Sequence, residues 1–110
     1  MKKIKLLTKK YFYHFQNKNI KELENMFSDK ISLRDWSING NGKKKVLSLN
    51  SRMFQNYKKI KIKILNLSII NKKSYAEISI NIKNKDYLVL DIIEFDKKNK
   101  IKSIKAFKGS

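Results

Sequence analysis

The sequence predicts an α+β domain in which three helices cover one face of an antiparallel sheet. Apolar residues recur at helical spacing in the first half of the chain, and they alternate with polar residues in the second half. Helices and strands do not alternate along the chain, which excludes a doubly wound parallel sheet. The predicted order is α-α-β-α-β-β-β-β, and with no long linker or repeat we expect a single domain over residues 1–110.

The first third of the chain predicts two helices and a strand. Residues 2–16 carry apolar side chains at helical spacing, and a short second helix is predicted over residues 20–27. From Ile31 the period of the pattern changes to two. The strand predicted there places Ile31, Leu33 and Asp35 on one face.

A glycine-containing turn, a third helix and four strands are predicted next. Residues 39–42 read Asn-Gly-Asn-Gly, which predicts a turn, and a third helix is predicted over residues 44–57. Four strands on short turns, typical of an antiparallel meander, are predicted at residues 60–70, 76–82, 86–96 and 101–107. The strand over residues 86–96 is the most continuously apolar, so we expect it to be central.

The formal charge of +18 arises from 27 basic and 9 acidic residues. Lys, Asn and Ile supply 53 of the 110 residues, whereas Ala, Gly, Pro and Arg supply only 7. The first three have AT-rich codons and the last four GC-rich ones, so genome composition accounts for most of the charge. The lysines are spread along the whole chain, and we expect no specific nucleic-acid partner.

Several classes of site are excluded by composition. The chain has no cysteine and a single histidine, His14, which excludes disulfides, thiolate nucleophiles, Cys-based metal sites and multi-His metal sites. We therefore expect neither a metal nor a cofactor. No apolar run approaches the roughly 20 residues that span a bilayer, so no membrane association is expected. The first residues are basic but lack the apolar segment of a signal peptide, and we expect a cytoplasmic protein.

Three polar residues lie at positions predicted to be apolar. Tyr11 lies on the buried stripe of the first helix, so its hydroxyl needs a partner in the interior. Asp35 shares a strand face with apolar residues, a setting that raises the pKa of a carboxyl and makes it a usable base. Asp91 lies in the most apolar strand, where a carboxylate is costly unless protonated, paired or hydrogen-bonded. Two carboxyls and a phenol in one apolar interior suit enolisation, in which one group accepts a proton and two stabilise the oxyanion.

Each of these residues also has a structural interpretation, and the sequence leaves both open. Tyr11 is equally suited to be a core tyrosine bonded to a backbone carbonyl. Asp35 fits a strand-end or turn position at the rim of the domain. Asp91 fits a structural carboxyl of the central strand.

Three segments of the chain resemble the nuclear-transport-factor-2-like superfamily, and within it the SnoaL-like proteins and the ketosteroid isomerases. They run from Lys10 to Asp29, from Leu33 to Trp36 and from Leu90 to Phe107. The resemblance implies that the sheet curves around the three helices into a cone whose mouth opens between the first helix and the sheet. It also implies a homodimer formed through the outer sheet face.

The resemblance to ketosteroid isomerases implies a role for each polar residue. Tyr11 and a protonated Asp91 look like the oxyanion donors, and Asp35 looks like the base that moves the proton. Trp36 stands where a proline often follows the base, and Asn50 stands where a supporting tyrosine is found. These differences argue against a steroid substrate more than against proton transfer.

We therefore expect a cofactor-independent isomerase-like enzyme that moves a proton next to a carbonyl of a small apolar ligand. The cavity is expected to be lined by Phe15, Phe27, Trp36, Phe54 and Val89, with Trp36 alternatively in a dimer contact. The alternative is a non-catalytic module of the same fold that binds a small molecule or a protein, because fold alone does not select a function.

Overall fold

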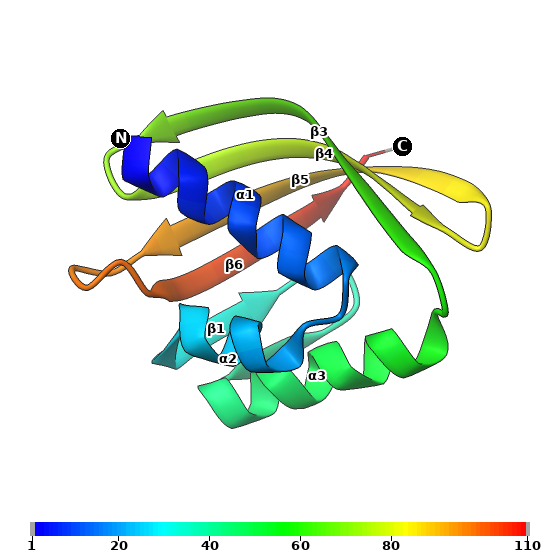
Figure 1. The fold of residues 1–110 in the computed structure, drawn as a ribbon, viewed down its shortest axis with the longest axis horizontal. Helices are drawn as coiled ribbons and strands as arrows, with labels where there is room; N and C mark the ends of the chain where they lie inside the picture. Colours follow the sequence, from blue (N-terminus) through cyan, green and yellow to red (C-terminus); the bar gives the residue numbers. More distant parts are fainter. Residues whose placement is uncertain (1, 110) are drawn as a thin grey trace.

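The computed structural model describes residues 2–109, in which three helices lie on the concave side of a curved six-stranded sheet (Figure 1). The first half of the chain forms α1 (Lys2–Gln16), α2 (Ile20–Met26), β1 (Phe27–Arg34), β2 (Asn39–Asn41) and α3 (Lys43–Asn56). The second half forms β3 (Ile60–Ile70), β4 (Lys73–Ile82), β5 (Lys85–Phe95) and β6 (Ile101–Lys108). The predicted α+β class and the order of the major elements are confirmed.

The strands follow the order β2-β1-β6-β5-β4-β3 across the sheet. The four late strands form the predicted antiparallel meander, with β5 between β4 and β6. β1, however, pairs with β6 in parallel, with Leu33 opposite Ile104. The sheet is therefore mixed rather than wholly antiparallel. This pairing joins segments about 70 residues apart, which local alternation cannot reveal.

The predicted turn at residues 39–42 is wrong in its position. The chain turns at residues 35–38, where the Asp35 N–H donates to the Ile38 carbonyl oxygen at 2.9 Å, and Asn39–Asn41 then pairs with β1 as a short strand. Gly40 allows this strand to pass close to α3, because a Cβ atom there would lie 2.9 Å from Leu49 Cδ1. The glycine serves a close approach of backbone to helix.

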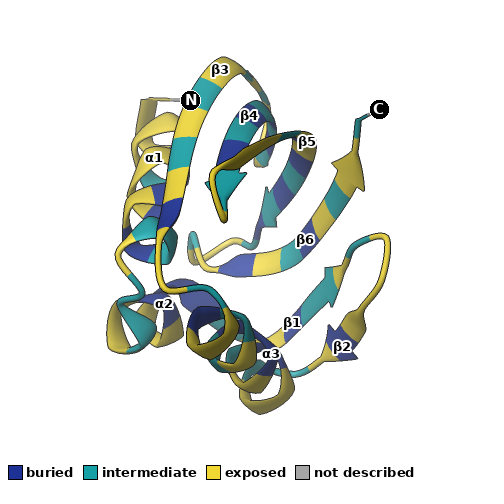
Figure 2. Ribbon diagram, turned by 90° about the vertical axis from the view of Figure 1, so that its right-hand side faces the viewer, coloured by how far each residue is buried: buried dark blue, intermediate teal, exposed yellow. Residues whose placement is uncertain are grey.

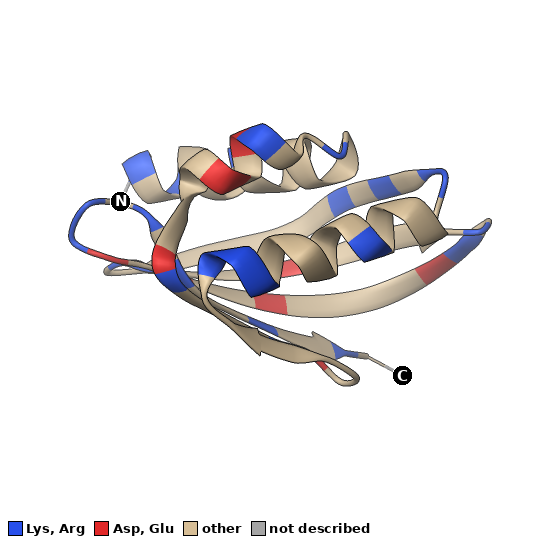
Figure 3. Cartoon of the chain, turned by 90° about the horizontal axis from the view of Figure 1, so that it is seen from below, with Lys and Arg blue, Asp and Glu red and all other residues tan. Residues whose placement is uncertain are grey.

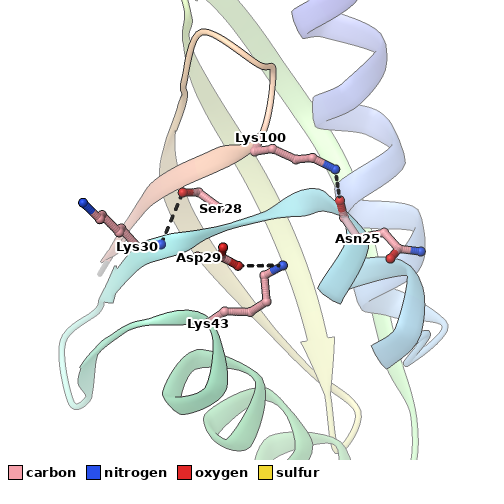
Figure 4. A network of polar contacts seen from close by, with 6 residues as sticks. All are labelled: Asn25, Ser28, Asp29, Lys30, Lys43 and Lys100. Atoms are coloured by element: carbon pink, nitrogen blue, oxygen red, sulfur yellow. Dashed lines mark hydrogen bonds and ion pairs between the residues drawn. The ribbon is translucent and has the colours of Figure 1, made fainter.

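The start of β1 is connected to two other parts of the chain (Figure 4). Lys100, which precedes β6, donates from Nζ to the carbonyl oxygen of Asn25 at 2.5 Å. Lys43, at the start of α3, forms an ion pair with Asp29 at 3.3 Å. These contacts join the α2–β1 junction to the β5–β6 turn and to α3.

The core lies between the concave face of the sheet and the helices (Figure 2). Burial alternates along β4, which places Ala76, Ile78 and Ile80 on the inner face. Tyr11 and Phe12 of α1 are buried against this layer. Among residues 2–109, no helix combines the length and the apolar character needed to cross a bilayer.

Candidate active site

A cavity of about 620 Å³ lies between α1, α3 and the concave face of the sheet. Its volume is within the range of roughly 300–1,000 Å³ that is usual for small-molecule sites. Aliphatic side chains from five strands form part of its wall: Leu33, Ile62, Ile78, Ile80, Val89 and Ile104. The inner wall is therefore apolar, whereas polar and charged side chains, among them Arg52, Lys83 and Lys108, line other parts of the cavity.

The structure brings the three predicted catalytic residues, Tyr11, Asp35 and Asp91, to this one cavity. Tyr11 comes from the inward face of α1, and Asp91 comes from the middle of β5, where alternation turns it inward with Val89. Asp35 was predicted on a strand face, but β1 ends at Arg34, so Asp35 lies at the following turn, which forms one side of the cavity. The three side chains thus come from three separate elements.

Asp91 is only 7% exposed, and its carboxyl has an altered acidity. Burial, and after it the negative charge of Asp35, raises the pKa of Asp91 to about 7. Its cross-strand neighbours are Ala76 on β4 and Ala106 on β6, neither of which has a side-chain donor that could stabilise a carboxylate. A substantial fraction of Asp91 is therefore a neutral acid near pH 7, and a neutral acid can donate a hydrogen bond.

Tyr11 is buried against aromatic neighbours, with its ring centroid 5.2 Å from that of Phe12 and 5.9 Å from that of Phe15. Burial, and after it the charge of Asp91, raises the pKa of the Tyr11 hydroxyl well above its ordinary value. The hydroxyl consequently stays protonated. It forms no side-chain hydrogen bond within residues 2–109, so its donor is available to a ligand.

Asp35 is half-buried, and its two carboxyl oxygens have different surroundings. Oδ1 accepts hydrogen bonds from the backbone N–H groups of Ser37 and Ile38, both at 2.8 Å. Oδ2 accepts none from the described part of the chain. The residue therefore serves the turn with one oxygen and keeps the other available to accept a proton.

The predicted apolar lining is found at some positions and not at others. Phe15, Trp36 and Val89 line the cavity, and Trp36 is 55% exposed at its edge. Phe54 instead packs edge-on against Phe15 at 5.0 Å, and Phe27 lies 6.4 Å from the Tyr11 ring, so these two support the wall from behind. Helical spacing identifies a buried face but does not distinguish side chains that reach the cavity from those that fill the core.

Asn50, which stands where related isomerases have a supporting tyrosine, is a further polar residue of the cavity lining. It is 6% exposed, and its Nδ2 has no hydrogen-bond partner within residues 2–109. A buried amide without a partner is costly, so it favours a ligand oxygen in the cavity. The sequence could have indicated that Asn50 is buried, because it lies four residues from both Val46 and Phe54 on the apolar face of α3.

His14 does not line the cavity. Its Nδ1 accepts a hydrogen bond from Asn19 Nδ2 at 3.0 Å, at the turn between α1 and α2. Over residues 2–109, no three His, Asp or Glu side chains are grouped as metal ligands would be.

No protein-family model and no curated protein matches the chain. The fold itself is found in many solved structures. A candidate SnoaL-like polyketide cyclase from Shewanella putrefaciens superposes with a TM-score of 0.88 at 11% identity, over 98% of this chain and 80% of the other. A candidate ketosteroid isomerase from Kribbella flavida has a TM-score of 0.87 at 12% identity, over 100% of this chain and 80% of the other.

An LEH-like epoxide hydrolase from M. tuberculosis has the same architecture, with a TM-score of 0.78 at 13% identity, over 90% of this chain and 77% of the other. The matched structures thus carry names from three reaction classes, so the likeness identifies a fold and not a reaction. From its helices, its curved mixed sheet and these superpositions, the chain has the nuclear-transport-factor-2-like fold of the SnoaL-like proteins.

Proposed function

We propose that this protein is a cofactor-independent enzyme that moves a proton next to a carbonyl group of a small apolar ligand. One observation carries the proposal: the same cavity is lined by a carboxyl group with an available oxygen, by a phenol, and by a buried carboxyl whose raised pKa favours its neutral form. The first group belongs to Asp35, the phenol to Tyr11 and the buried carboxyl to Asp91, which donates a hydrogen bond when protonated. These are the groups that enolisation requires.

In the proposed reaction, Asp35 Oδ2 removes a proton from the carbon next to the carbonyl. The electron pair moves to the carbonyl oxygen, which accepts hydrogen bonds from the Tyr11 hydroxyl and the Asp91 carboxyl. Asp35 then returns the proton to a more distant carbon, so that the double bond migrates without net gain or loss of atoms. Asn50 Nδ2 supplies a further donor from the α3 side of the cavity.

The test is turnover of β,γ-unsaturated ketones, followed by the ultraviolet absorbance of the conjugated product. Asp35→Asn should lower turnover by about 10²- to 10⁴-fold, because it removes the base. It should leave binding of the conjugated ketone largely intact, because the side-chain shape is kept. Asp29→Asn is the matched control, since Asp29 is an exposed acid paired with Lys43 and does not line the cavity. Equal turnover by wild type and Asp35→Asn would contradict the proposed base.

A second candidate function is small-molecule binding without catalysis. One observation favours it: two backbone N–H groups donate hydrogen bonds to Asp35 Oδ1. These bonds give Asp35 a structural role in the turn that does not depend on catalysis. In that case a ketone binds in the cavity and no ketone of the panel is converted. Ligand binding measured beside turnover separates the two functions.

A homodimer formed through the outer face of the sheet belongs to the same proposal. Leu88, Leu90 and Phe107 are exposed large apolar side chains on β5 and β6, and Leu90 lies directly opposite Phe107. Strand alternation turns these residues away from the cavity. Adjacent exposed apolar side chains on a sheet favour a protein contact.

A further inference from the structure

A second hollow, of about 470 Å³, opens beside the cavity. It lies between the α3–β3 junction and the β4–β5 turn, where basic segments of the chain come together on one side of the molecule (Figure 3). Its wall contains three ammonium groups and three side-chain amides, from Lys58, Lys59, Lys83, Asn56, Asn81 and Asn84. The hollow therefore presents many N–H donors and no acidic lining residue.

The second hollow adjoins the cavity of the candidate active site. Asn56, Tyr57 and Lys83 line both of them. Lys83 Nζ lies 5.4 Å from the centroid of the Tyr57 ring, a cation–π distance that keeps the ammonium at the boundary. A ligand with its apolar part in the cavity can therefore extend past Tyr57 into a strongly basic region.

The charges around the second hollow are not cancelled by neighbouring acids. The two ion pairs within residues 2–109 involve Lys43 and Lys102, which lie elsewhere. Asp86, an exposed acid on β5, accepts a hydrogen bond from Asn81 Nδ2 at 2.8 Å, so one carboxylate stands beside three ammonium groups. The local balance remains positive.

The end of α3 would oppose an anion here, because the last carbonyl groups of a helix carry partial negative charge. Lys18 offsets this effect. Its Nζ donates to the carbonyl oxygens of Phe54 at 3.0 Å and Lys58 at 2.8 Å, and also to that of Tyr57. The carbonyl oxygens beside the hollow are therefore covered by a cation.

We infer that the second hollow binds a phosphate monoester group of the ligand whose apolar, carbonyl-bearing part occupies the cavity. The inference rests on the proposed function for the position of the apolar part. A phosphate monoester carries about −1.5 to −2 charges at pH 7 and three acceptor oxygens, which suits several ammonium and amide donors better than a carboxylate does. Lysine contributes to such a site as a point charge.

The test compares two probes with the same apolar part, 4-phenylbutyl phosphate and 4-phenylbutan-1-ol. Binding is measured by calorimetry at 150 mM salt and checked by the fluorescence of Trp36, the single tryptophan, which lines the cavity. The phosphate should bind about tenfold tighter than the alcohol or better, as expected for charge-assisted hydrogen bonds. Inorganic phosphate should compete with the phosphate probe alone.

The decisive variants remove equal charge at different places. Lys58→Gln with Lys59→Gln, at two residues that line the second hollow and not the cavity, should abolish the advantage of the phosphate and leave alcohol binding within about twofold. Lys97→Gln with Lys98→Gln is the control, since this turn lies at the other end of β5 and the loss of net charge is the same.

The possible outcomes separate this inference from the proposed function. Equal binding of the two probes, or an equal loss in both double variants, overturns the phosphate site and leaves the cavity as a ligand site. If neither probe binds, both the phosphate site and ligand binding in the cavity are contradicted. A phosphate advantage that is lost only with Lys58 and Lys59 supports the inference, whether or not a ketone is turned over.

Discussion

Ala106 of β6 lies directly opposite Asp91 of β5 in the register of the sheet. Ala76 occupies the matching position on β4, and these are the only two alanines of the chain. Bulky β-branched residues dominate the neighbouring inward positions of the same strands. Two small side chains therefore flank the buried carboxyl, which leaves space above it and supplies no donor to it.

Enlarging Ala106 should close this space. Ala106→Leu places a branched side chain in the wall of the cavity next to Asp91 and should weaken binding of an apolar ketone about tenfold or more, because overpacking typically costs about 1–3 kcal/mol. Ala106→Ser, which hardly changes the volume, should bind as wild type does. Calorimetric titration of the three proteins checks the expectation, and unchanged affinity of the leucine variant would place the ligand elsewhere.

Stability should depend on pH through Asp91. Its pKa is raised from an ordinary 3.8 to about 7 in the folded protein, so the folded state holds this proton more tightly than the unfolded state. The contribution of this proton to the free energy of unfolding is complete below about pH 4 and is lost as the pH rises towards 7. Its total is on the order of 4 kcal/mol.

Urea denaturation between pH 4 and pH 8 measures this dependence. The free energy of unfolding of wild type contains a component that falls with rising pH over this range, and Asp91→Asn should lack that component because its amide does not titrate. Turnover should also fall above about pH 7, as ionised Asp91 no longer donates to the oxyanion. Parallel pH profiles of stability for wild type and Asp91→Asn would show that Asp91 titrates as an ordinary acid.

Removing the Tyr11 hydroxyl should affect the chemical step. Tyr11→Phe keeps the buried ring and should cost about 2–4 kcal/mol of transition-state stabilisation, the size of one lost oxyanion donor. Tyr13→Phe is the matched control, because Tyr13 lies on the same helix with its side chain exposed. Steady-state kinetics should show a lower kcat for the first variant only, and wild-type kcat for Tyr11→Phe would assign this hydroxyl to the core.

The outer sheet face should control the oligomeric state. Phe107 is 53% exposed and lies opposite Leu90, so Phe107→Lys places a charge in the centre of the proposed contact. This variant should sediment as a monomer at concentrations where wild type is a dimer, because an unpaired buried charge opposes association. Leu6→Lys is the control, since Leu6 is an exposed apolar residue of α1. A monomeric wild type at high concentration would contradict the dimer.

Much of the fold could be predicted from the sequence because its signals are local. Helical spacing located α1 and α3, and alternation located the four strands of the meander to within a few residues. Polar residues in apolar stretches pointed to Tyr11, Asp35 and Asp91, since each conflicts with a local pattern that is otherwise regular. Asn50 is likewise a polar residue on the apolar face of α3. Its burial and its unpartnered amide indicate a role in binding a ligand.

Only the tertiary structure decided which of these residues share one space. The parallel pairing of β1 with β6 and the position of the turn at residues 35–38 bring Asp35 to the cavity that contains Asp91, and neither is encoded in a local period. The same holds for Phe27 and Phe54, which have the expected burial but support the wall from behind. Periodicity determines which face of an element is buried, whereas the meeting of separate elements depends on contacts between residues far apart in the chain.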